Sequence, residues 1–538
     1  MTDGTPPTAA GTVATTDRHA APAAGRRLSR PVLVTYGLAQ LVLLFWWAVY
    51  HPGLFSPDSL SYITQATTGT WNTHHPITYT GLVWLSLQIF GGVGALTGLQ
   101  TVAMAIGLAY AVGGLRRVGV PGWLAAGAAV VTVALPPVGG FVVAVWKDVP
   151  FVICHVFLLG TLARVVARHR AGLRPLLPAG LLVAAAVEMT LICLFRQNGF
   201  IVVAIVAVAC ALLLRPAGRL LITTVAAATA ALLTNWALLP ALGVRDSGSL
   251  VAYEALFADI SVAYAADPAA FPPEHTEVMA RVAPLSHWRD AADCYHSDSL
   301  TYAEPFDRRA ASVHSGALVD VWLATLGRAP GTVVGARICR SSIGWSPLPA
   351  GTISRNPPEW SLRAWVERDR DFQKSPYAHV ARMRPLDERV HRIGAELTGL
   401  ANRPGLEWLM WRGATWTYLA YAAVGFAAWR RREPALLALA ALSAGNQLSV
   451  LIVNNVQAAR YMAAPYVLGV LLLPLLAVRR SPAATTAAPS DAADPPAAAG
   501  GPAVETGGGD RDGADPAPPR QRGDHDGPAA QARLDERG

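Results

Sequence analysis

The stretch PVLVTYGLAQLVLLFWWAVY, residues 31–50, contains no charged side chain. About 20 apolar residues are what an α-helix needs to cross the hydrocarbon core of a bilayer. The whole chain has 538 residues, of which 52% are hydrophobic and 15% are charged, well below the ~25% charge typical of soluble domains. These features exclude an ordinary water-soluble enzyme and predict a membrane protein.

Apolar runs of comparable length recur along the chain. We predict membrane spans at 32–50, 94–115, 121–138, 149–167, 176–195, 199–214, 219–241, 408–429, 434–453 and 461–478. The sequence therefore predicts an all-α polytopic membrane protein with about ten transmembrane helices. A further apolar run, 77–91, is ambiguous by composition alone.

The predicted spans divide the chain into five parts. Alanine, proline and polar residues dominate both ends, which is typical of disordered segments. The parts are a leader at 1–30, a transmembrane core at 31–242 with its first outer loop at 51–76, an outer insertion at 243–407, C-terminal transmembrane helices at 408–480 and a tail at 481–538. Within the insertion, 313–340 is predicted to form an amphipathic helix.

The distribution of charge predicts the topology. Segments 31–242 and 408–480 carry 17 basic residues but only four acidic ones. If the N-terminus is cytoplasmic and 77–91 does not cross the membrane, 13 of these 17 fall on the cytoplasmic side, as the positive-inside rule requires. We therefore predict that 77–91 is an interfacial or re-entrant helix on the outer face, and that both termini are cytoplasmic. The net charge of +8 is then a topological signal and does not indicate nucleic-acid binding.

The polar residues of the core gather in four predicted outer segments. These are SPDSLSYITQATTGTWNTHHP (56–76), VWKDVPF (145–151), FRQNGF (195–200) and NNVQAARYM (454–462). The candidate site residues are Asp58, His74, His75, Lys147, Asp148, Arg196, Gln197, Asn198, Arg460 and Tyr461. Ionisable groups near a membrane are costly and usually line a cavity or pathway, so this grouping predicts a functional site on the outer face.

A carboxylate beside several cations suits the transfer of a sugar from a lipid phosphate to a hydroxyl. The leaving phosphate needs cations, which Lys147, Arg196 and Arg460 could supply. The attacking hydroxyl must lose a proton, which suits Asp58 as a general base. Asp148, the two histidines, Gln197, Asn198 and Tyr461 would shape the pocket.

The first outer loop resembles that of the GT-C superfamily of multi-span glycosyltransferases, which includes protein O-mannosyltransferases and the aminoarabinose transferase. The matching residues are Asp58, Tyr62, Ala66, Gly69, His75 and Pro76. WKDVPF, RQNG and ARYMAAPY resemble segments of a less characterised bacterial branch. The resemblance covers the first 200 residues and the last outer turn, and the insertion does not match the soluble domains of the named enzymes.

This resemblance implies that Asp58 is the catalytic base and that the donor is a polyprenyl-phosphate sugar. The acceptor would be a glycan, lipid or protein of the envelope, outside a bacterial plasma membrane.

Simpler interpretations remain open. Asp58 could be a helix cap, Lys147 and Asp148 could be a local pair, and the arginines could contact lipid headgroups. A transporter or flippase for a lipid-linked or anionic solute would use the same cations, and a non-catalytic envelope scaffold is a third alternative. The sequence shows no zinc or calcium pattern, so no cofactor is expected, although Asp148 could hold a divalent metal. Cys294 and Cys339 share the outer insertion, where a disulfide is permitted.

Overall fold

The computed structural model describes residues 29–479 apart from 174–176, 247–249, 357–365, 367–369 and 379–380. The chain divides into two units, 1–481 and 482–538, and the described residues all belong to the first. The predicted leader, except Ser29 and Arg30, and the whole predicted tail therefore lie outside the described residues. Over the described ranges the secondary structure is helical, with only isolated β-bridges.

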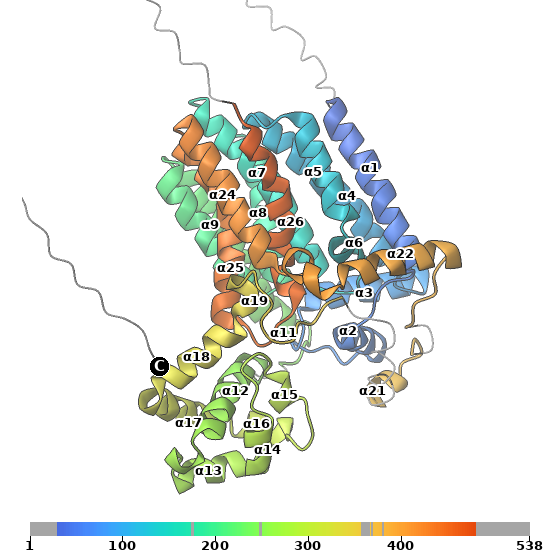
Figure 1. Ribbon diagram of the computed structural model, residues 1–538. Helices are drawn as coiled ribbons and strands as arrows, with labels where there is room; N and C mark the ends of the chain where they lie inside the picture. The colour runs from blue at the N-terminus through green and yellow to red at the C-terminus, as the bar shows by residue number, and fades with distance from the viewer. Residues whose placement is uncertain are drawn as a thin grey trace, which may run out of the picture. The chain divides into compact units, whose positions relative to one another are not determined.

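Every segment predicted to span the membrane is largely helical, and Figure 1 shows the long helices running side by side. The helices are α1 (Arg30–Val49), α4 (Gly94–Arg117), α5 (Gly122–Ala134), α6 (Pro136–Val142), α7 (Asp148–Arg170), α8 (Ala179–Phe195), α9 (Gly199–Leu213), α10 (Gly218–Leu233), η2 (Thr234–Leu238), α11 (Leu239–Ala241), α24 (Gly413–Arg431), η5 (Pro434–Ala440), α25 (Ala441–Val453), η6 (Ala459–Met462), α26 (Ala463–Leu472) and η7 (Leu473–Ala477).

Six of these helical segments are long and apolar enough to cross a membrane, and a seventh qualifies if α5 and α6, which meet at a bend of 73°, form one span. Helices α8 and α9 are apolar but shorter. The chain is thus a polytopic, all-helical membrane protein over its described residues. The count of ten spans stays a prediction.

Small residues allow α4 and α7 to pack closely. A Cβ added to Gly114 would lie 2.5 Å from the carbonyl oxygen of Gly160, and one added to Gly160 would lie 3.1 Å from Cα of Ala111. No side chain fits at either position without moving the backbone of the partner helix. Membrane helices gain much of their association energy from such close van der Waals contact.

Arginines gather at one end of the helix bundle. Arg170, at the end of α7, forms an ion pair of 2.6 Å with Glu433 and donates a 2.9 Å hydrogen bond to the carbonyl of Val118. Arg431 donates to the same carbonyl and to that of Arg479. Helix α7 has 23 residues, so its other end, at Asp148, lies about 34 Å away, close to the thickness of a bilayer core.

Two short helices, α2 (Pro57–Thr68) and α3 (Ile77–Phe90), lie at the end of the bundle where α7 begins (Figure 1). Helix α3 corresponds to the ambiguous run 77–91. Its 14 residues extend only about 21 Å, less than a bilayer core. The hydroxyl of Tyr79 in α3 donates a 3.0 Å hydrogen bond to Gln100 of α4, which fixes α3 to the bundle.

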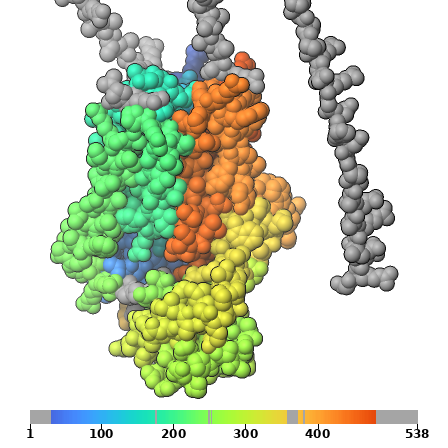
Figure 2. All heavy atoms as spheres, turned by 90° about the vertical axis from the view of Figure 1, so that its left-hand side faces the viewer, coloured from blue at the N-terminus to red at the C-terminus, as the bar shows by residue number. Residues whose placement is uncertain are grey.

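The first part of the insertion forms its own helical cluster at the same end, as Figure 2 shows, whereas later helices of the insertion pack against the membrane bundle. Its helices are α12 (Leu250–Ala266), η3 (Pro268–Ala270), α13 (Pro273–Ala280), α14 (Leu285–Asp290), α15 (Asp298–Thr301), α16 (Arg308–Val313), α17 (Ser315–Arg328), α18 (Pro330–Arg340) and α19 (Ser342–Trp345), and then α21 (Arg370–Gln373), α22 (Glu388–Ala401), η4 (Pro404–Leu406) and α23 (Glu407–Met410). Phe257, Trp288 and Leu318 form part of a hydrophobic core that belongs to the insertion. A disulfide joins Cys294 to Cys339.

The prediction of one amphipathic helix over 313–340 is wrong. The structure has two helices there, α17 and α18, which are separated at Ala329. Pro330 begins α18, and proline has no amide hydrogen to continue the hydrogen bonding of α17. The disulfide to Cys339 holds the second helix against the rest of the insertion.

The two ends of the bundle should lie on opposite sides of the membrane. Thr70 is exposed beside α2, and Arg117 is exposed at the arginine-rich end. We expect a cysteine substituted at each position to react with an impermeant maleimide, and the two to react from opposite sides of sealed vesicles. The natural free cysteines, Cys154, Cys193 and Cys210, are buried, and the unsubstituted chain is the control. Labelling of both positions from one side would contradict this arrangement.

Candidate functional site

The segment before α2 is paired with the segment before α7. The backbone of Leu54 accepts from the amide of Val145 at 2.9 Å and donates to the carbonyl of Val143 at 3.1 Å. The hydroxyl of Ser59 donates to the carbonyl of Val145 at 2.8 Å, and Trp146 Nε1 donates to Ser56 Oγ at 2.5 Å. These bonds place the beginning of α2 directly beside Lys147 and Asp148.

Asp58 does not cap its own helix. Ser56 occupies the N-cap position of α2, and its amide donates to Ser59 Oγ at 2.9 Å, as in a capping box. The Asp58 carboxylate instead accepts a 2.7 Å hydrogen bond from Arg460 Nη1, across 402 residues of sequence. The side chain keeps 20% of its surface exposed, so it is accessible to a substrate.

Two aromatic rings hold Arg460 in place. Its guanidinium carbon lies 5.0 Å from the centre of the Trp146 ring and 5.5 Å from that of Tyr461. Cation–π contacts of this kind stabilise an arginine while leaving several of its N–H groups available. Arg460 can therefore bind Asp58 and an anionic ligand at the same time.

A second carboxylate–arginine pair lies close by. Asp148, at the first position of α7, is 1% exposed and forms an ion pair with Arg196. The guanidinium of Arg196 lies 4.7 Å from the ring of Tyr461, so this tyrosine contacts both arginines. Asp148 Oδ2 has no hydrogen-bond partner among the described residues.

A lysine, two histidines and a tyrosine complete the cluster. Lys147 Nζ lies 3.1 Å from Nδ1 of His75, whose ring is 4.5 Å from that of His74. The ring of Tyr62 packs at 4.9 Å from that of His75. The Tyr62 hydroxyl is buried without a hydrogen-bond partner in the part of the chain that the structure describes.

The charged residues of the cluster shift one another's pKa values. Burial by itself would raise the pKa of the Asp58 carboxyl, but Arg460 and Lys147 outweigh it and hold that pKa well below its ordinary value of 3.8. Burial, with Lys147 nearby, lowers the pKa of His75 well below 6.5. At neutral pH, Asp58 is therefore an anion and His75 is neutral, so that Nδ1 of His75 can accept a hydrogen bond from the Lys147 ammonium.

The structure brings together most, but not all, of the residues that the sequence singled out. Asp58, His74, His75, Lys147, Asp148, Arg196, Arg460 and Tyr461 form the cluster described above. Asn198 instead donates to Ser449 of α25 at 2.9 Å, which ties two helices together. Gln197 is exposed, and no contact places it in the cluster.

The insertion adds polar residues that sequence reasoning missed. Asp298, at the start of α15, and Tyr302 both interact electrostatically with Asp58. Arg308 interacts electrostatically with His74. The guanidinium carbon of Arg308 lies 4.0 Å from the centre of the Tyr302 ring. No spacing in the sequence signals these residues, because they are brought to the site only by the docking of the insertion.

Two contacts dock the insertion onto the segment that carries Arg460. The amide of Ser297 donates to the carbonyl of Asn455 at 3.0 Å. Glu254, whose side chain is 3% exposed, pairs with Arg308 at 2.8 Å and accepts from Asn455 Nδ2 at 3.4 Å. Burial raises the pKa of Glu254 to about 7 in spite of Arg308.

Among the described residues, no group of three or more His, Cys, Asp or Glu side chains is arranged to hold a metal ion. Asp148 and Asp58 are each bound to an arginine instead.

Comparison of the chain with known protein families, with curated proteins and with solved structures finds no match. The chemistry of the site therefore has to be inferred from its own residues.

The buried ion pair between Asp148 and Arg196 should stabilise the folded protein. Asp148→Asn removes the charge opposite Arg196, which is only 15% exposed, and leaves that cation uncompensated. We expect a loss of about 3 kcal/mol in the free energy of unfolding, seen as a lower melting temperature in detergent. Glu277→Gln is the matched control, because its pair with Arg281 is more than half exposed, and it should change stability by less than about 0.5 kcal/mol. Equal effects of the two substitutions would contradict the structural role of the Asp148 pair.

The lowered pKa of His75 predicts a pH dependence of stability. The unfolded chain takes up a proton on His75 near its ordinary value of 6.5, whereas the folded protein does so only at lower pH. His75 should therefore lower the free energy of unfolding as the pH falls from 7.5 to 5.5, by up to about 1.4 kcal/mol per unit below 6.5. Glu254, whose raised pKa of about 7 makes the folded protein take up a proton in this range, has the opposite effect, so the contribution of His75 is measured by comparison with a variant.

His74, whose pKa is also lowered, acts in the same direction as His75. Asp58 does not contribute in this range, because both its ordinary and its lowered pKa lie below it. In thermal melts across the range, His75→Gln should lose less stability between pH 7.5 and 5.5 than the unsubstituted chain. His314→Gln, at the start of α17, is the control, and an unchanged slope in His75→Gln would contradict the assignment.

Proposed function

We propose that this protein transfers a sugar from a polyprenyl-phosphate-linked donor to a hydroxyl acceptor at the outer face of a bacterial plasma membrane. The observation that carries the proposal is the ionised, partly exposed Asp58 held by Arg460 beside Lys147 and Arg196. This cluster lies at the end of the bundle opposite the arginine-rich end. An anion and three cations at this end of the bundle support a lipid-linked phosphate as the donor.

The reaction makes two demands that the cluster can meet. The acceptor oxygen attacks the anomeric carbon, the bond from that carbon to the phosphate oxygen breaks, and the lipid phosphate leaves with the electron pair. Arg196, Arg460 and Lys147 would stabilise the negative charge on this phosphate. The acceptor proton would pass to Asp58, which is already ionised at neutral pH because of its cationic neighbours.

The low pKa of Asp58 fits a particular kind of proton transfer. A strongly stabilised carboxylate is a weak base, so it removes a proton only from a hydroxyl that has become acidic in the transition state. As negative charge develops on the leaving phosphate, Arg460 can shift its hydrogen bonding toward the phosphate, and this raises the basicity of Asp58. The Asp58–Arg460 pair would in this way couple departure of the phosphate to deprotonation of the acceptor.

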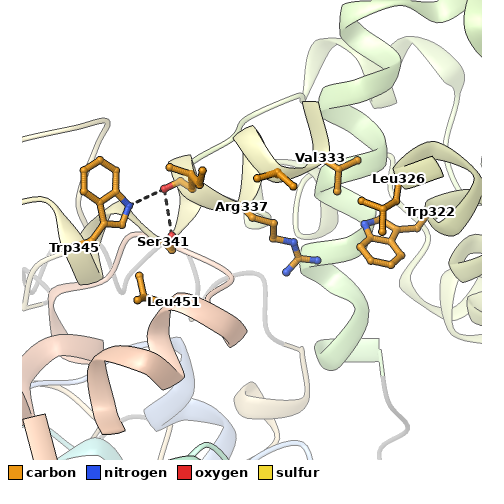
Figure 3. A pocket seen from close by; sticks show the side chains of 9 residues that line it. Trp322, Leu326, Val333, Arg337, Ser341, Trp345 and Leu451 are labelled. Atoms are coloured by element: carbon orange, nitrogen blue, oxygen red, sulfur yellow. Dashed lines mark hydrogen bonds between the residues drawn. The ribbon is translucent and has the colours of Figure 1, made fainter. Parts of the chain in front are cut away.

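An apolar groove at the same end of the bundle as the cluster offers a place for the lipid chain of the donor. Figure 3 shows it between α17, α18 and α19 and the end of α25, with a volume of about 600 Å³. Its lining residues are Trp322, Leu326, Val333, Val334, Arg337, Ile338, Ser341, Trp345 and Leu451. Gln457, three residues before Arg460, donates to the carbonyl of Cys339 in α18 at 3.0 Å. This bond joins α18, which lines part of the groove, to the segment that carries Arg460.

The insertion would select the acceptor. Asp298, Tyr302 and Arg308 approach the cluster from the insertion, as described above, and they provide hydrogen-bonding groups for hydroxyls.

The proposed topology has ten spans and both termini in the cytoplasm, with the arginine-rich end on the cytoplasmic side as the positive-inside rule requires.

The central test is a transfer assay on purified protein with radiolabelled polyprenyl-phosphate sugars and envelope extracts as acceptors. We expect Asp58→Asn to reduce the rate of transfer by about 10²- to 10⁴-fold, because the general base is lost while the charge of the cations remains. Asp290→Asn, in an exposed pair with Arg289, is the matched control and should retain full activity.

Two results would overturn the proposal. Full activity of Asp58→Asn would exclude the base. Absence of transfer from every donor, together with movement of a lipid-linked or anionic solute across proteoliposome membranes, would favour a transporter or flippase.

A further inference from the structure

A second cavity lies at the arginine-rich end of the bundle, about one bilayer thickness from the candidate site. It is a groove between α1 and α4 with a volume of about 680 Å³, within the range of ~300–1,000 Å³ typical of ligand sites. Its walls are mainly apolar and include Leu33 and Tyr36 of α1 and Ile106 of α4. These three side chains are 39–52% exposed, and they belong to helices that are apolar enough to cross the membrane.

Three arginines line this groove, Arg116 and Arg117 from α4 and Arg164 from α7. Arg116 and Arg117 are exposed. Arg164 lies six residues before the end of α7, so it begins about 9 Å inside the helix bundle. The groove therefore combines apolar walls with a positively charged mouth.

An aromatic ring and a backbone carbonyl hold Arg164 in place. The guanidinium carbon lies 3.6 Å from the centre of the Tyr110 ring, and Nη1 donates a 2.6 Å hydrogen bond to the carbonyl of Gly160. Within the described ranges Arg164, Arg116 and Arg117 form no ion pair with a carboxylate, whereas nearby Arg170 is paired with Glu433. Glu188 interacts electrostatically with Arg164, and its carboxyl accepts a hydrogen bond from Thr161 at 2.9 Å.

An arginine at this depth is costly unless an anion accompanies it. Basic pockets between membrane helices bind the phosphates of anionic lipids, and polar contacts there are combined with burial of acyl chains. We propose that the groove binds an anionic phospholipid of the surrounding leaflet, with its phosphate on Arg116, Arg117 and Arg164 and an acyl chain along α1 and α4. This inference depends on the membrane-spanning fold and is independent of the transfer reaction.

The charges of the chain itself favour a lipid as the occupant. Residues 1–30, which precede α1, carry four basic and two acidic residues, so they do not complement the arginines. Residues 481–538 carry ten acidic and five basic residues, but they are rich in alanine, proline and glycine, and Val504 and Leu534 are their only larger apolar residues besides proline. A phospholipid supplies both the anion and the apolar chain.

The test is native mass spectrometry of the full chain in detergent, with dioleoyl phosphatidylglycerol added. We expect Arg164→Gln and the double variant Arg116→Gln/Arg117→Gln to weaken lipid binding at least about 10-fold, because each removes phosphate contacts. The control is the double variant Arg430→Gln/Arg432→Gln, which removes the same charge from the same end but outside the groove. It should bind phosphatidylglycerol like the unsubstituted chain.

Other probes distinguish the source of the ligand. Dioleoyl phosphatidylcholine should not compete with phosphatidylglycerol, and inorganic phosphate should compete only weakly. Equal binding of phosphatidylcholine, tighter binding of a polyprenyl phosphate, or lipid binding that appears only after removal of residues 482–538 would each overturn the proposal. Transfer activity need not change in the groove variants, so this result is separate from the test of Asp58.

Discussion

The pairing of two carboxylates with two arginines holds the candidate site together. Asp58 pairs with Arg460 and Asp148 pairs with Arg196, and Tyr461 contacts both guanidinium groups. Burial of a charge without a partner is costly, so each pair constrains its two segments to stay together. The beginnings of α2 and α7, the turn before α9 and the turn before α26 thereby converge, although they are far apart in the sequence.

Helix α7 connects the candidate site to the arginine-rich end of the bundle. It begins at Asp148, in the candidate site, and ends at Arg170, in the arginine-rich end. The arginines at that end are bonded mainly to Glu433 and to backbone carbonyls, whereas those of the site face carboxylates, aromatic rings and histidines. Cations of the same chemical type therefore have different partners at the two ends of α7. The groove beside Arg164 lies at the arginine-rich end.

The insertion turns an open end of the helix bundle into an enclosed site. Its backbone pairs with Asn455, and the buried Glu254 bonds both Arg308 and the Asn455 side chain. The segment between α25 and α26 therefore contacts the insertion on one side and Asp58 on the other. A change in how the insertion docks would be transmitted to Arg460 through only a few residues, which fits a role in acceptor selection.

The sequence by itself determined the membrane class, the positions of the helices and the short set of charged residues between the apolar segments. These follow from local properties, namely apolar length and the scarcity of acids in the apolar segments. The tertiary structure decided which charges pair. It assigned capping to Ser56 and Ser59 and left Asp58 for Arg460, and it separated Asn198 from the cluster. It also divided 313–340 at Pro330 and supplied Asp298, Tyr302 and Arg308 from the insertion. Such pairings depend on contacts between residues hundreds of positions apart, which no local pattern in the sequence encodes.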